Sequence, residues 1–494
     1  MQKVLILDLG GQCDLLIARR VRECHVFCEI HPAAMPLDKI RAFEPKGIIL
    51  SGTPGGIGQI DPQIFQLGVP VLGIGLGCQT MIAALGGAVE PCSPIHGRTL
   101  TNLSEDAVLF AEMPPMTISW MDIDAQITAL PDGFVATAST NNCPIAAFSC
   151  PERQLYGTQF RPESPHTEGG MGMLDRFLKS ICGCVGDWRM ENVVNDAVAD
   201  IRRRVGDRRV LLALSGGVDS SVAAAVLSRA VGSRLTCIFV DHGMLRMDEG
   251  DQVEAYFSRM DVHFVRVNAR ERFQSALENV TDPTEKRRII GEEFVKVFED
   301  QAKKLGSIDF LAQGTIYPDI LETGPGYADV IRSSREMGRL PGHIDFKELI
   351  EPLRLLFKEE VRELGRTMGL PAYLVDRQPF PGPGLAIRMM GNITPEKIRL
   401  LQAADHIVTQ ELEGSHLNRS IGQYFAVLTD TMTMGGYIVA LRVVTTEDYL
   451  TAKWARLPYE LLDKISTRLM TEVPGISRVT LDITNKPPAS IEWE

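Results

Sequence analysis

The chain has 494 residues, of which 45% are hydrophobic and 23% are charged, and its formal net charge is −12 at pH 7. This length and composition predict roughly two to four globular domains and exclude a disordered chain. The acidic charge argues against a protein that binds nucleic acid through its phosphates, and no apolar run is long enough to cross a bilayer. We therefore expect a cytoplasmic protein without a nucleic-acid or membrane partner.

The region from residue 1 to about 188 alternates short apolar strands with helical stretches. Strands are expected at residues 3–10, 26–30, 47–52 and 69–75, and helices at 17–22 and from Gln79 onwards. This alternation is typical of a doubly wound α/β domain, in which helices cover both faces of a mostly parallel sheet.

All ten cysteines lie at or before Cys237, and no two of them form a Cys-x-x-Cys pair. We interpret them as free, buried thiols rather than disulfides. The cluster Cys24, His25, Cys28 and His31 contains metal-ligand types, but it falls in an expected strand and lacks a second half-site. Zinc at this cluster is the less favoured alternative.

A second α/β region, residues 189–376, begins with a linker-like helix. Its strands are expected within residues 210–214, 235–243, 263–269 and 309–319. These strands end in polar turns, which is where open parallel sheets bind their ligands.

The first of these strands runs directly into a glycine-rich turn and the start of a helix. The turn consists of Ser215, Gly216, Gly217, Val218, Asp219, Ser220 and Ser221. Its glycines remove Cβ atoms where the backbone must approach an anion, and N–H groups lie at the positive end of the helix. Serine hydroxyls can donate to phosphate, and Asp219 is placed to hold Mg²⁺ against it. The sequence therefore predicts a phosphate-binding turn, which is no Walker A loop because Gly-Lys-Ser/Thr is missing.

A third region, residues 377–494, opens with a proline- and glycine-rich segment at 377–384 that excludes a helix and marks a boundary. Strands are expected beyond it at 424–428, 436–444 and 477–484, around two helices. We expect a small α+β domain here.

The Ser-Gly-Gly-x-Asp-Ser pattern after a strand resembles the PP-loop of the ATP pyrophosphatases, which activate a carbonyl oxygen as its adenylate and release pyrophosphate. Together with the segments 311–319 and 486–494, it resembles GMP synthetase over essentially the whole chain. In that family, ammonia from glutamine displaces AMP from adenylated xanthosine monophosphate (XMP).

The resemblance implies three domains: a class I glutamine amidotransferase-like domain at 1–188, an ATP pyrophosphatase domain at 189–376, and a dimerisation and substrate-binding domain at 377–494. ATP and Mg²⁺ are the expected cofactors, and a homodimer is the expected assembly. A purine nucleotide and ammonia are the expected substrates.

The resemblance also implies roles for single residues. Three are expected near the adenosine of ATP: Val240, Asp241 and Gly314. Three more are expected to bind the nucleotide substrate: Arg246, Lys486 and Glu492. Arginine and lysine suit a phosphate, and glutamate can accept from purine N–H groups. Alternatively, Lys486 and Glu492 are ordinary surface charges in a tail.

The amidotransferase region departs from the family at its catalytic residues. The family's nucleophile lies in a Gly-x-Cys-x-Gly elbow, whereas residues 73–77 place Gly75 at that position. Glycine adopts the strained backbone of an elbow easily but supplies no thiolate. Arg161 replaces the catalytic histidine and cannot accept its proton, so only Glu163 of the triad remains.

Cys78 and His166 are the nearest candidates for a substitute thiol and base. Cys78 lies three residues after the elbow glycine, inside the following helix, and His166 matches the family's second, non-catalytic histidine. We therefore predict an inactive glutaminase site in a domain that remains a structural partner.

The synthetase half departs from the family at two segments. The lid, residues 331–339, lacks both histidines of the family pattern but keeps a cation at Arg332, which we predict to stabilise phosphoryl charge. Arg335 and Arg339 are further candidates, and a solvated loop without a catalytic part is the alternative. The loop 431–437 is short and lacks the family's Asp, so one substrate contact is lost. The expected acceptor is XMP or a close analogue, and an acceptor other than XMP stays open.

Three functions stay open at this stage. The first is a ligase that adenylates an oxo-purine nucleotide and aminates it with free ammonia, possibly supplied by a separate protein. The second keeps the activation chemistry but uses a different acceptor or nucleophile. The third is a catalytically silent paralogue that binds nucleotide and regulates an active synthetase. The unaltered phosphate-binding turn favours an enzyme, because a purely structural role does not need it.

Overall fold

A computed structural model describes residues 2–10, 14–54, 59–306, 308–323, 346–417, 420–446 and 451–493. Its contacts divide the chain into two compact units, Met1–Val193 and Val194–Glu494. Among the helices in these described ranges, none is both long enough and apolar enough to cross a bilayer.

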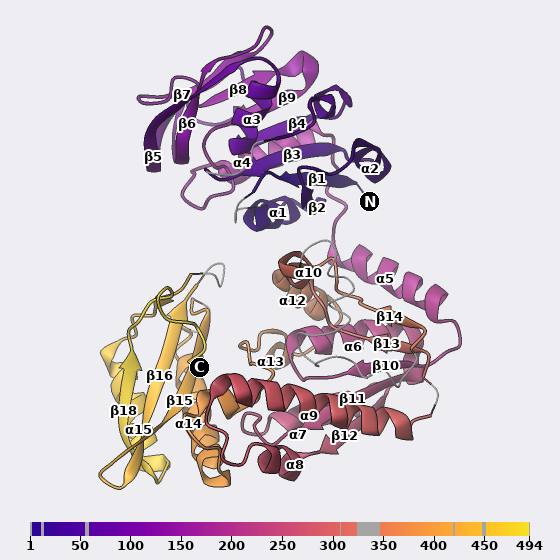
Figure 1. Cartoon of the computed structure of the whole chain (residues 1–494), viewed down its shortest axis with the longest axis vertical. Coiled ribbons are helices and arrows are strands. Elements are labelled where there is room, and N and C mark those ends of the chain that lie inside the picture. The colour runs from indigo at the N-terminus through magenta and orange to yellow at the C-terminus, as the bar shows by residue number, and fades with distance from the viewer. Residues whose placement is uncertain are drawn as a thin grey trace. The chain divides into compact units, whose positions relative to one another are not determined.

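The first unit is built on one nine-stranded sheet (Figure 1). Its strands are β1 (Lys3–Asp8), β2 (Phe27–Pro32), β3 (Gly47–Gly52), β4 (Val71–Gly75), β5 (Ala88–Leu103), β6 (Met116–Ala129), β7 (Val135–Thr140), β8 (Ala147–Cys150) and β9 (Leu155–Thr158). Its main helices are α1 (Asp14–Glu23), α2 (Leu37–Phe43), α3 (Leu76–Ala84) and α4 (Gly170–Arg176). The sheet order is β2-β1-β3-β4-β9-β8-β7-β5-β6.

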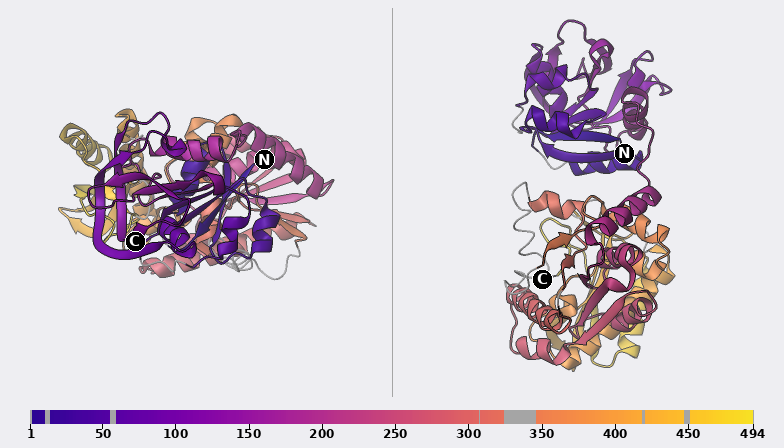
Figure 2. Two further views of the ribbon diagram at one scale, coloured as in Figure 1. Left: turned by 90° about the horizontal axis from the view of Figure 1, so that it is seen from above. Right: turned by 90° about the vertical axis from the view of Figure 1, so that its right-hand side faces the viewer.

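The two halves of this sheet differ in strand direction. Strands β2, β1, β3, β4 and β9 pair in parallel, and β8, β7, β5 and β6 join them in antiparallel pairs. The parallel half is the expected doubly wound pattern, and Figure 2 shows it from two further sides. The long β5–β6 pair was not expected, because prolines and an exposed face interrupt the apolar pattern of β5.

The second unit begins with a five-stranded parallel sheet in the order β12-β11-β10-β13-β14. Its strands are β10 (Val210–Ala213), β11 (Leu235–Asp241), β12 (His263–Asn268), β13 (Phe310–Ala312) and β14 (Glu348–Ile350). The helices around it are α5 (Met190–Val205), α6 (Val218–Val231), α7 (Glu249–Phe257), α8 (Arg270–Ala276), α9 (Pro283–Lys304), α10 (Tyr317–Thr323), α12 (Lys358–Thr367) and α13 (Ala372–Val375). Parallel pairing places the carboxyl ends of all five strands at one edge.

The second unit continues into a small mixed sheet. It contains β15 (Gln423–Thr433), β16 (Gly436–Thr445), β17 (Lys453–Trp454) and β18 (Ile476–Asp482). The helices are α14 (Pro395–Gly414), which packs on β15, and α15 (Tyr459–Glu472), which packs on α14 and β18 (Figure 1). The chain therefore has the predicted class: two α/β sheets followed by an α+β part.

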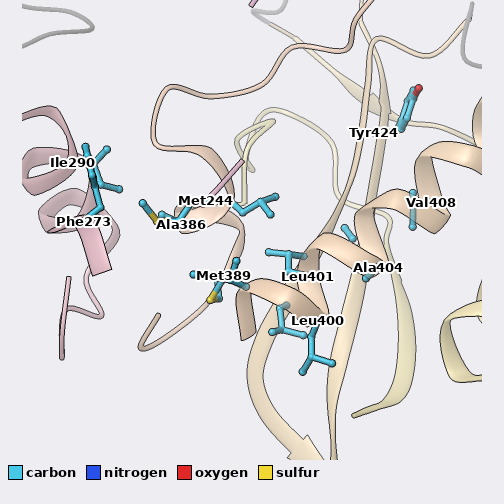
Figure 3. Packing of buried hydrophobic residues seen from close by; sticks show 14 of the residues in the cluster. Met244, Phe273, Ile290, Ala386, Met389, Leu400, Leu401, Ala404, Val408 and Tyr424 are labelled. Carbon is cyan, nitrogen blue, oxygen red and sulfur yellow. The ribbon is translucent and has the colours of Figure 1, made fainter. Parts of the chain in front are cut away.

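One hydrophobic core joins the two sheets of the second unit. It contains Leu211 and Ile238 of the parallel sheet as well as Leu428 and Val439 of the mixed sheet. Figure 3 shows the middle of this core, where Leu400, Leu401 and Ala404 of α14 lie near Met389 and Ala386. The expected domain boundary at residue 377 stays a prediction, because a shared core gives no compact division at that point.

Candidate functional site

The phosphate-binding turn joins β10 to α6 in the second unit, as the sequence predicts. Gly216 has a φ of +80°, a conformation that favours glycine, and Gly217 is the residue before the first turn of α6. The Ser215 and Ser220 hydroxyls lie 3.0 Å apart, and the Ser220 hydroxyl donates to the Gly217 carbonyl. These bonds fix the turn at the positive end of a 14-residue helix, which suits an anion.

Asp219 of this turn has a partner that the sequence analysis missed. Lys358, the first residue of α12, donates from Nζ to both Asp219 carboxylate oxygens, at 2.8 and 2.6 Å. Both side chains are about 30% exposed, so a ligand can reach them. Lys358 thus brings a cation of α12 to the turn, where its charge is balanced by Asp219 in this structure.

The carboxylate of Asp219 also fits Mg²⁺, since hard oxygen ligands are the ones this ion prefers. Among the described residues, no group of three or more His, Cys, Asp or Glu side chains forms a metal-binding cluster. Mg²⁺ at Asp219 would therefore depend on phosphate oxygens and water for its remaining ligands, as is usual for magnesium bound with a nucleotide.

Gly314 lies directly against this turn. A Cβ atom at Gly314 would lie 3.0 Å from the Asp219 carbonyl carbon and from the Ser220 backbone nitrogen. A side chain is therefore excluded at this position, and the segment after β13 packs backbone to backbone on the start of α6. The structure thus brings Gly314 to the turn, and its expected place near the adenosine stays a prediction.

Val240 and Asp241 end β11, the strand beside β10, and both are buried. The Asp241 carboxylate accepts hydrogen bonds from Arg266, at 2.7 Å, and from Arg270, at 2.8 Å. Burial alone would raise the pKa of Asp241, but these bonds and one from the Gly243 amide lower it. Asp241 therefore stays ionised and is held by side chains of β12 and α8. Because its carboxylate is engaged by these arginines, a contact with adenosine would come from the backbone of Asp241.

Arg246 lies in a second polar cluster, after β11. Its Nε is 3.2 Å from Oδ2 of Asp405 on α14, and its guanidinium lies 4.9 Å from the centre of the Phe380 ring. Its Nη2 atom is buried and makes no hydrogen bond within the part of the chain that the structure describes. A buried guanidinium nitrogen of this kind is suited to an anionic ligand group.

The tail that follows β18 is bound to the mixed sheet by a buried arginine. Arg442 on β16 donates to the backbone carbonyls of Thr484, Ser490 and Ile491, and it pairs with Asp482 at 3.0 Å. These bonds hold the segment that carries Lys486 and Glu492 in one place. The tail is therefore an ordered part of the fold.

Glu492 is itself fixed by three hydrogen bonds. Arg388 donates to both of its carboxylate oxygens, at 2.8 and 3.0 Å, and Gln423 donates to Oε1 at 2.8 Å. The Arg388 guanidinium lies 5.3 Å from the Phe380 ring, the same ring that Arg246 faces. Glu492 is thus held by two side chains, and its partner Arg388 shares the Phe380 ring with Arg246.

Lys486 is the third residue predicted to bind the acceptor. Its backbone pairs with Ala452 in an isolated antiparallel bridge, and its side chain is partly exposed. The segment 331–339, with Arg332, Arg335 and Arg339, lies outside the described residues, and the role of Arg332 stays a prediction.

The loop 431–437 is a tight hairpin between β15 and β16. Thr433 pairs with Gly436, so only Met434 and Gly435 form the turn, and both have positive φ. The Met434 side chain is 94% exposed. The nearest acidic residue of this hairpin, Asp430, is paired with Lys397, so the hairpin carries no carboxylate beyond this pair.

In the first unit, the turn from β4 to α3 keeps the backbone of a nucleophile elbow without a nucleophile. Gly75 has φ 56° and ψ −120°, a combination almost restricted to glycine. A Cβ atom there would lie 3.4 Å from Nη1 of Arg161 and 3.3 Å from the Gly52 carbonyl oxygen. The Arg161 guanidinium therefore lies beside the elbow, in van der Waals contact with the place that a Cβ atom at position 75 would take.

Arg161 and Glu163 form a buried ion pair beside this elbow. Nε of Arg161 lies 2.6 Å from Oε1 of Glu163, and the two side chains are 4% and 1% exposed. Asp14 of α1 is also buried nearby, and burial raises the pKa of its carboxyl to about 8, against a smaller lowering effect of Arg161. The glutamate that remains from the triad is thus paired with a fixed cation, without a titratable base between them.

Neither candidate substitute lies at this elbow in a reactive form. Cys78 of α3 is fully buried against β4 and β9, where a Cβ atom added at Gly73 or Gly157 would press on it. Burial raises the pKa of its thiol well above the usual range. His166 is exposed and stacks on Trp120, with ring centres 4.8 Å apart. A protonated core thiol is a poor nucleophile.

Three family models match consecutive parts of the chain. They are glutamine amidotransferase class-I at residues 5–181, asparagine synthase at 189–292 and GMP synthase C terminal domain at 410–493. The first covers the unit with the altered elbow, the second covers the phosphate-binding turn, and the third covers the bound tail.

Curated relatives match over nearly the full length. Proteins named GMP synthase [glutamine-hydrolyzing] from Acetivibrio thermocellus and Clostridium botulinum are each 50% identical, over 99% of this chain and 99% of theirs. The protein of that name from Treponema denticola is also 50% identical, over 100% of this chain and 97% of its own. With matches of this length and identity, the chain belongs to the GMP synthase family.

Proposed function

We propose that this protein is a GMP synthase-like ligase that uses ATP to adenylate XMP, or a close analogue, and aminates it with free ammonia. Family membership and the intact phosphate-binding turn support the ATP-dependent step. One observation supports the ammonia dependence: the elbow carries Gly75, which supplies no thiol, and the residue that lies beside it is Arg161, which supplies no base.

In the proposed reaction, the purine carbonyl oxygen attacks the α-phosphorus of ATP, and pyrophosphate leaves. Ammonia then adds to the activated carbon, loses a proton, and AMP leaves with the former carbonyl oxygen. The turn 215–221 binds the departing pyrophosphate through backbone N–H groups, and Lys358 offsets its charge. Mg²⁺ held by Asp219 would supply further positive charge to the phosphates.

The acceptor nucleotide is proposed to bind around Phe380. Arg246 and Lys486 would contact its phosphate, and Glu492 would accept from N–H groups of the base. Two sets of contacts support this assignment. Arg388 and Gln423 donate hydrogen bonds that hold the Glu492 carboxylate in place, and Asp405 orients Arg246. Arg332 is proposed to stabilise phosphoryl charge from the lid.

The test is a pyrophosphate-release assay with XMP, ATP and Mg²⁺, run with ammonium or with glutamine as nitrogen source. We expect pyrophosphate and an aminated nucleotide with ammonium, and neither product above background with glutamine. Glutamate formation is measured in parallel, and its appearance would contradict the loss of glutaminase activity. If no acceptor nucleotide gives pyrophosphate release, the catalytically silent paralogue is the function that remains.

A second candidate, an acceptor other than XMP, is favoured by the loop 431–437, which closes as a two-residue turn at Met434 and Gly435 and lacks the Asp of the family. A panel of purine nucleotides in the same assay decides between them. If XMP gives the highest kcat/KM, the second candidate is excluded.

The proposed assembly is a homodimer formed through residues 377–494, with ammonia supplied by a separate protein or from solution. Light scattering of the purified chain, together with a variant that replaces exposed Met434 by Lys, tests the dimer. A monomer at all concentrations would exclude it.

A further inference from the structure

Arg377 lies between the phosphate-binding turn and the acceptor cluster, although neither the family resemblance nor the proposed chemistry uses it. Its Nη1 donates to the Gly216 carbonyl at 2.8 Å, and its Nη2 lies 2.9 Å from Oε1 of Glu249. The two side chains are 11% and 3% exposed. One guanidinium thus holds a backbone atom of the turn and a buried carboxylate at the same time.

Glu249 continues this connection from the other side. Its second oxygen, Oε2, accepts from the backbone N–H of Arg246 at 2.8 Å. The Arg246 side chain in turn pairs with Asp405, whose Oδ1 accepts from the Ala426 amide of β15. Three consecutive polar contacts therefore run from the phosphate-binding turn, through Arg377 and Glu249, to Arg246.

The backbone around Arg377 is held in place as well. Arg362 on α12 donates to the carbonyls of Val375, at 2.6 Å, and of Arg377, at 3.1 Å. Gln402 on α14 donates to the carbonyl of Leu245, next to Arg246. Both ends of the connection are anchored to helices, so a displacement at one end is not absorbed by a loose loop.

We propose that Arg377 is a positioning residue that couples ATP binding to acceptor binding, by tying Gly216 to Arg246 through Glu249. This inference rests on the proposed function, because it takes the turn as the ATP site and Arg246 as an acceptor contact. A phosphate that draws the turn toward it pulls on the Gly216 carbonyl and hence on Arg377. The same displacement reaches the Arg246 backbone through the carboxylate of Glu249.

The geometry requires arginine and not merely a cation. The planar guanidinium presents two nitrogens in a fixed fork, and here one nitrogen takes each partner. A lysine at this position keeps the charge for Glu249 but donates from a single point, so it satisfies only one of the two contacts. Arg377→Lys therefore removes one of the two contacts and keeps the positive charge, whereas Arg377→Ala would remove both.

The experiment measures the affinity of the full chain for XMP in the presence and absence of a non-hydrolysable ATP analogue with Mg²⁺. For the wild type we expect the analogue to change XMP affinity about 10-fold, within the range that linked sites usually show. In Arg377→Lys this factor falls to about one, while the affinity for each ligand alone changes less than about threefold. Glu249→Gln, which removes one acceptor, is expected to give the same result and to add nothing in the double variant.

Arg468→Lys serves as the matched control. Arg468 also bridges two carboxylates, those of Glu411 and Glu472, but it lies on α15 away from the connection. It should keep the full coupling factor. If Arg377→Lys does not fold, as judged by thermal melting, Glu249→Gln decides.

The outcomes distinguish a failure of the role assigned to Arg377 from a failure of the proposed function. A wild type that couples and variants that also couple overturn the role of Arg377 and leave the proposed function intact. A wild type that binds neither ligand, or releases no pyrophosphate, overturns both. A coupling factor that also falls in Arg468→Lys would show a general effect of lost ion pairs and would equally overturn the inference.

Discussion

The two units each contain a strand, a glycine-rich turn and a helix, and the two turns differ in what surrounds them. At Gly216, the turn keeps its serines, an aspartate and a lysine partner around an open helix end. At Gly75, the backbone has the strained conformation of an elbow, but glycine supplies no nucleophile and the Arg161 guanidinium lies beside it. The backbone of an elbow can thus form without a nucleophilic side chain, because glycine adopts this conformation easily.

The largest expected effect is on the stability of the altered elbow. Arg161→Met leaves the Glu163 carboxylate buried without its charged partner, which should lower the free energy of unfolding by about 3–5 kcal/mol. Activity with ammonium should stay unchanged at a temperature where the variant is folded. Calorimetry of the full chain measures the first quantity and pyrophosphate release the second.

Arg98→Met is the control for this change, because its pair with Glu168 is about 60% exposed on both sides. It should cost less than about 1 kcal/mol. If both variants lose the same free energy of unfolding, the buried pair at the elbow stabilises the chain no more than an exposed pair does.

The next effect concerns the intact turn. Lys358→Met removes the cation that faces Asp219 and should lower kcat about 10²–10³-fold, since charge on the phosphates then develops without it. Lys296→Met, which removes an exposed lysine on α9 paired with Glu293, is the control and should keep full activity. Steady-state pyrophosphate release measures both variants. If kcat of Lys358→Met decreases by less than about fivefold, Lys358 has no role in the reaction.

A matched pair of substitutions compares the two turns directly. Gly216→Ala and Gly75→Ala each place a Cβ atom on a residue with positive φ, at a cost of about 1–3 kcal/mol in stability. Only Gly216→Ala should also raise KM for ATP, because its Cβ would lie 3.1 Å from Val253 and displace the turn. If Gly75→Ala raised that KM equally, the two turns would not be functionally distinct.

The smallest effect is a change in pH dependence. Because the folded-state pKa of Asp14 is raised to about 8, the folded chain binds more protons than the unfolded chain between about pH 4 and pH 8. This carboxyl therefore contributes stability at low pH that is lost as pH rises toward 8. Asp14→Asn should remove that part of the slope and change little near pH 5, as denaturant unfolding across this range would reveal. An unchanged slope would mean that Asp14 is ionised in the folded chain.

The sequence was sufficient to predict the parallel sheets and the strand, turn and helix around Gly216. These features depend on local patterns: apolar runs, glycines and the start of a helix. Lys358 was missed because it lies 139 positions from Asp219, and nothing local marks a lysine at the start of a helix as its partner. The β5–β6 pair was missed because its prolines and exposed face hide the alternation of a strand.

The side-chain partners of the predicted site residues were equally beyond the sequence. Asp241 was expected near adenosine, but which charges hold it depends on how β11, β12 and α8 pack together. The same is true of Glu492, whose partners Arg388 and Gln423 come from two distant segments. The sequence alone shows Gly75 and Arg161 at the positions where the family has a thiol and an imidazole, but it does not show that the Arg161 guanidinium lies against the elbow.

The contact between Arg161 and the elbow also bears on evolutionary reversal. A cysteine regained at position 75 alone would face a guanidinium and no base. A histidine regained at position 161 alone would leave no nucleophile and would exchange a permanent cation beside Glu163 for a neutral ring. If the proposed loss of glutaminase activity holds, a thiol and a base stand together at this elbow only after both residues change, and the change at position 161 removes a buried charge pair.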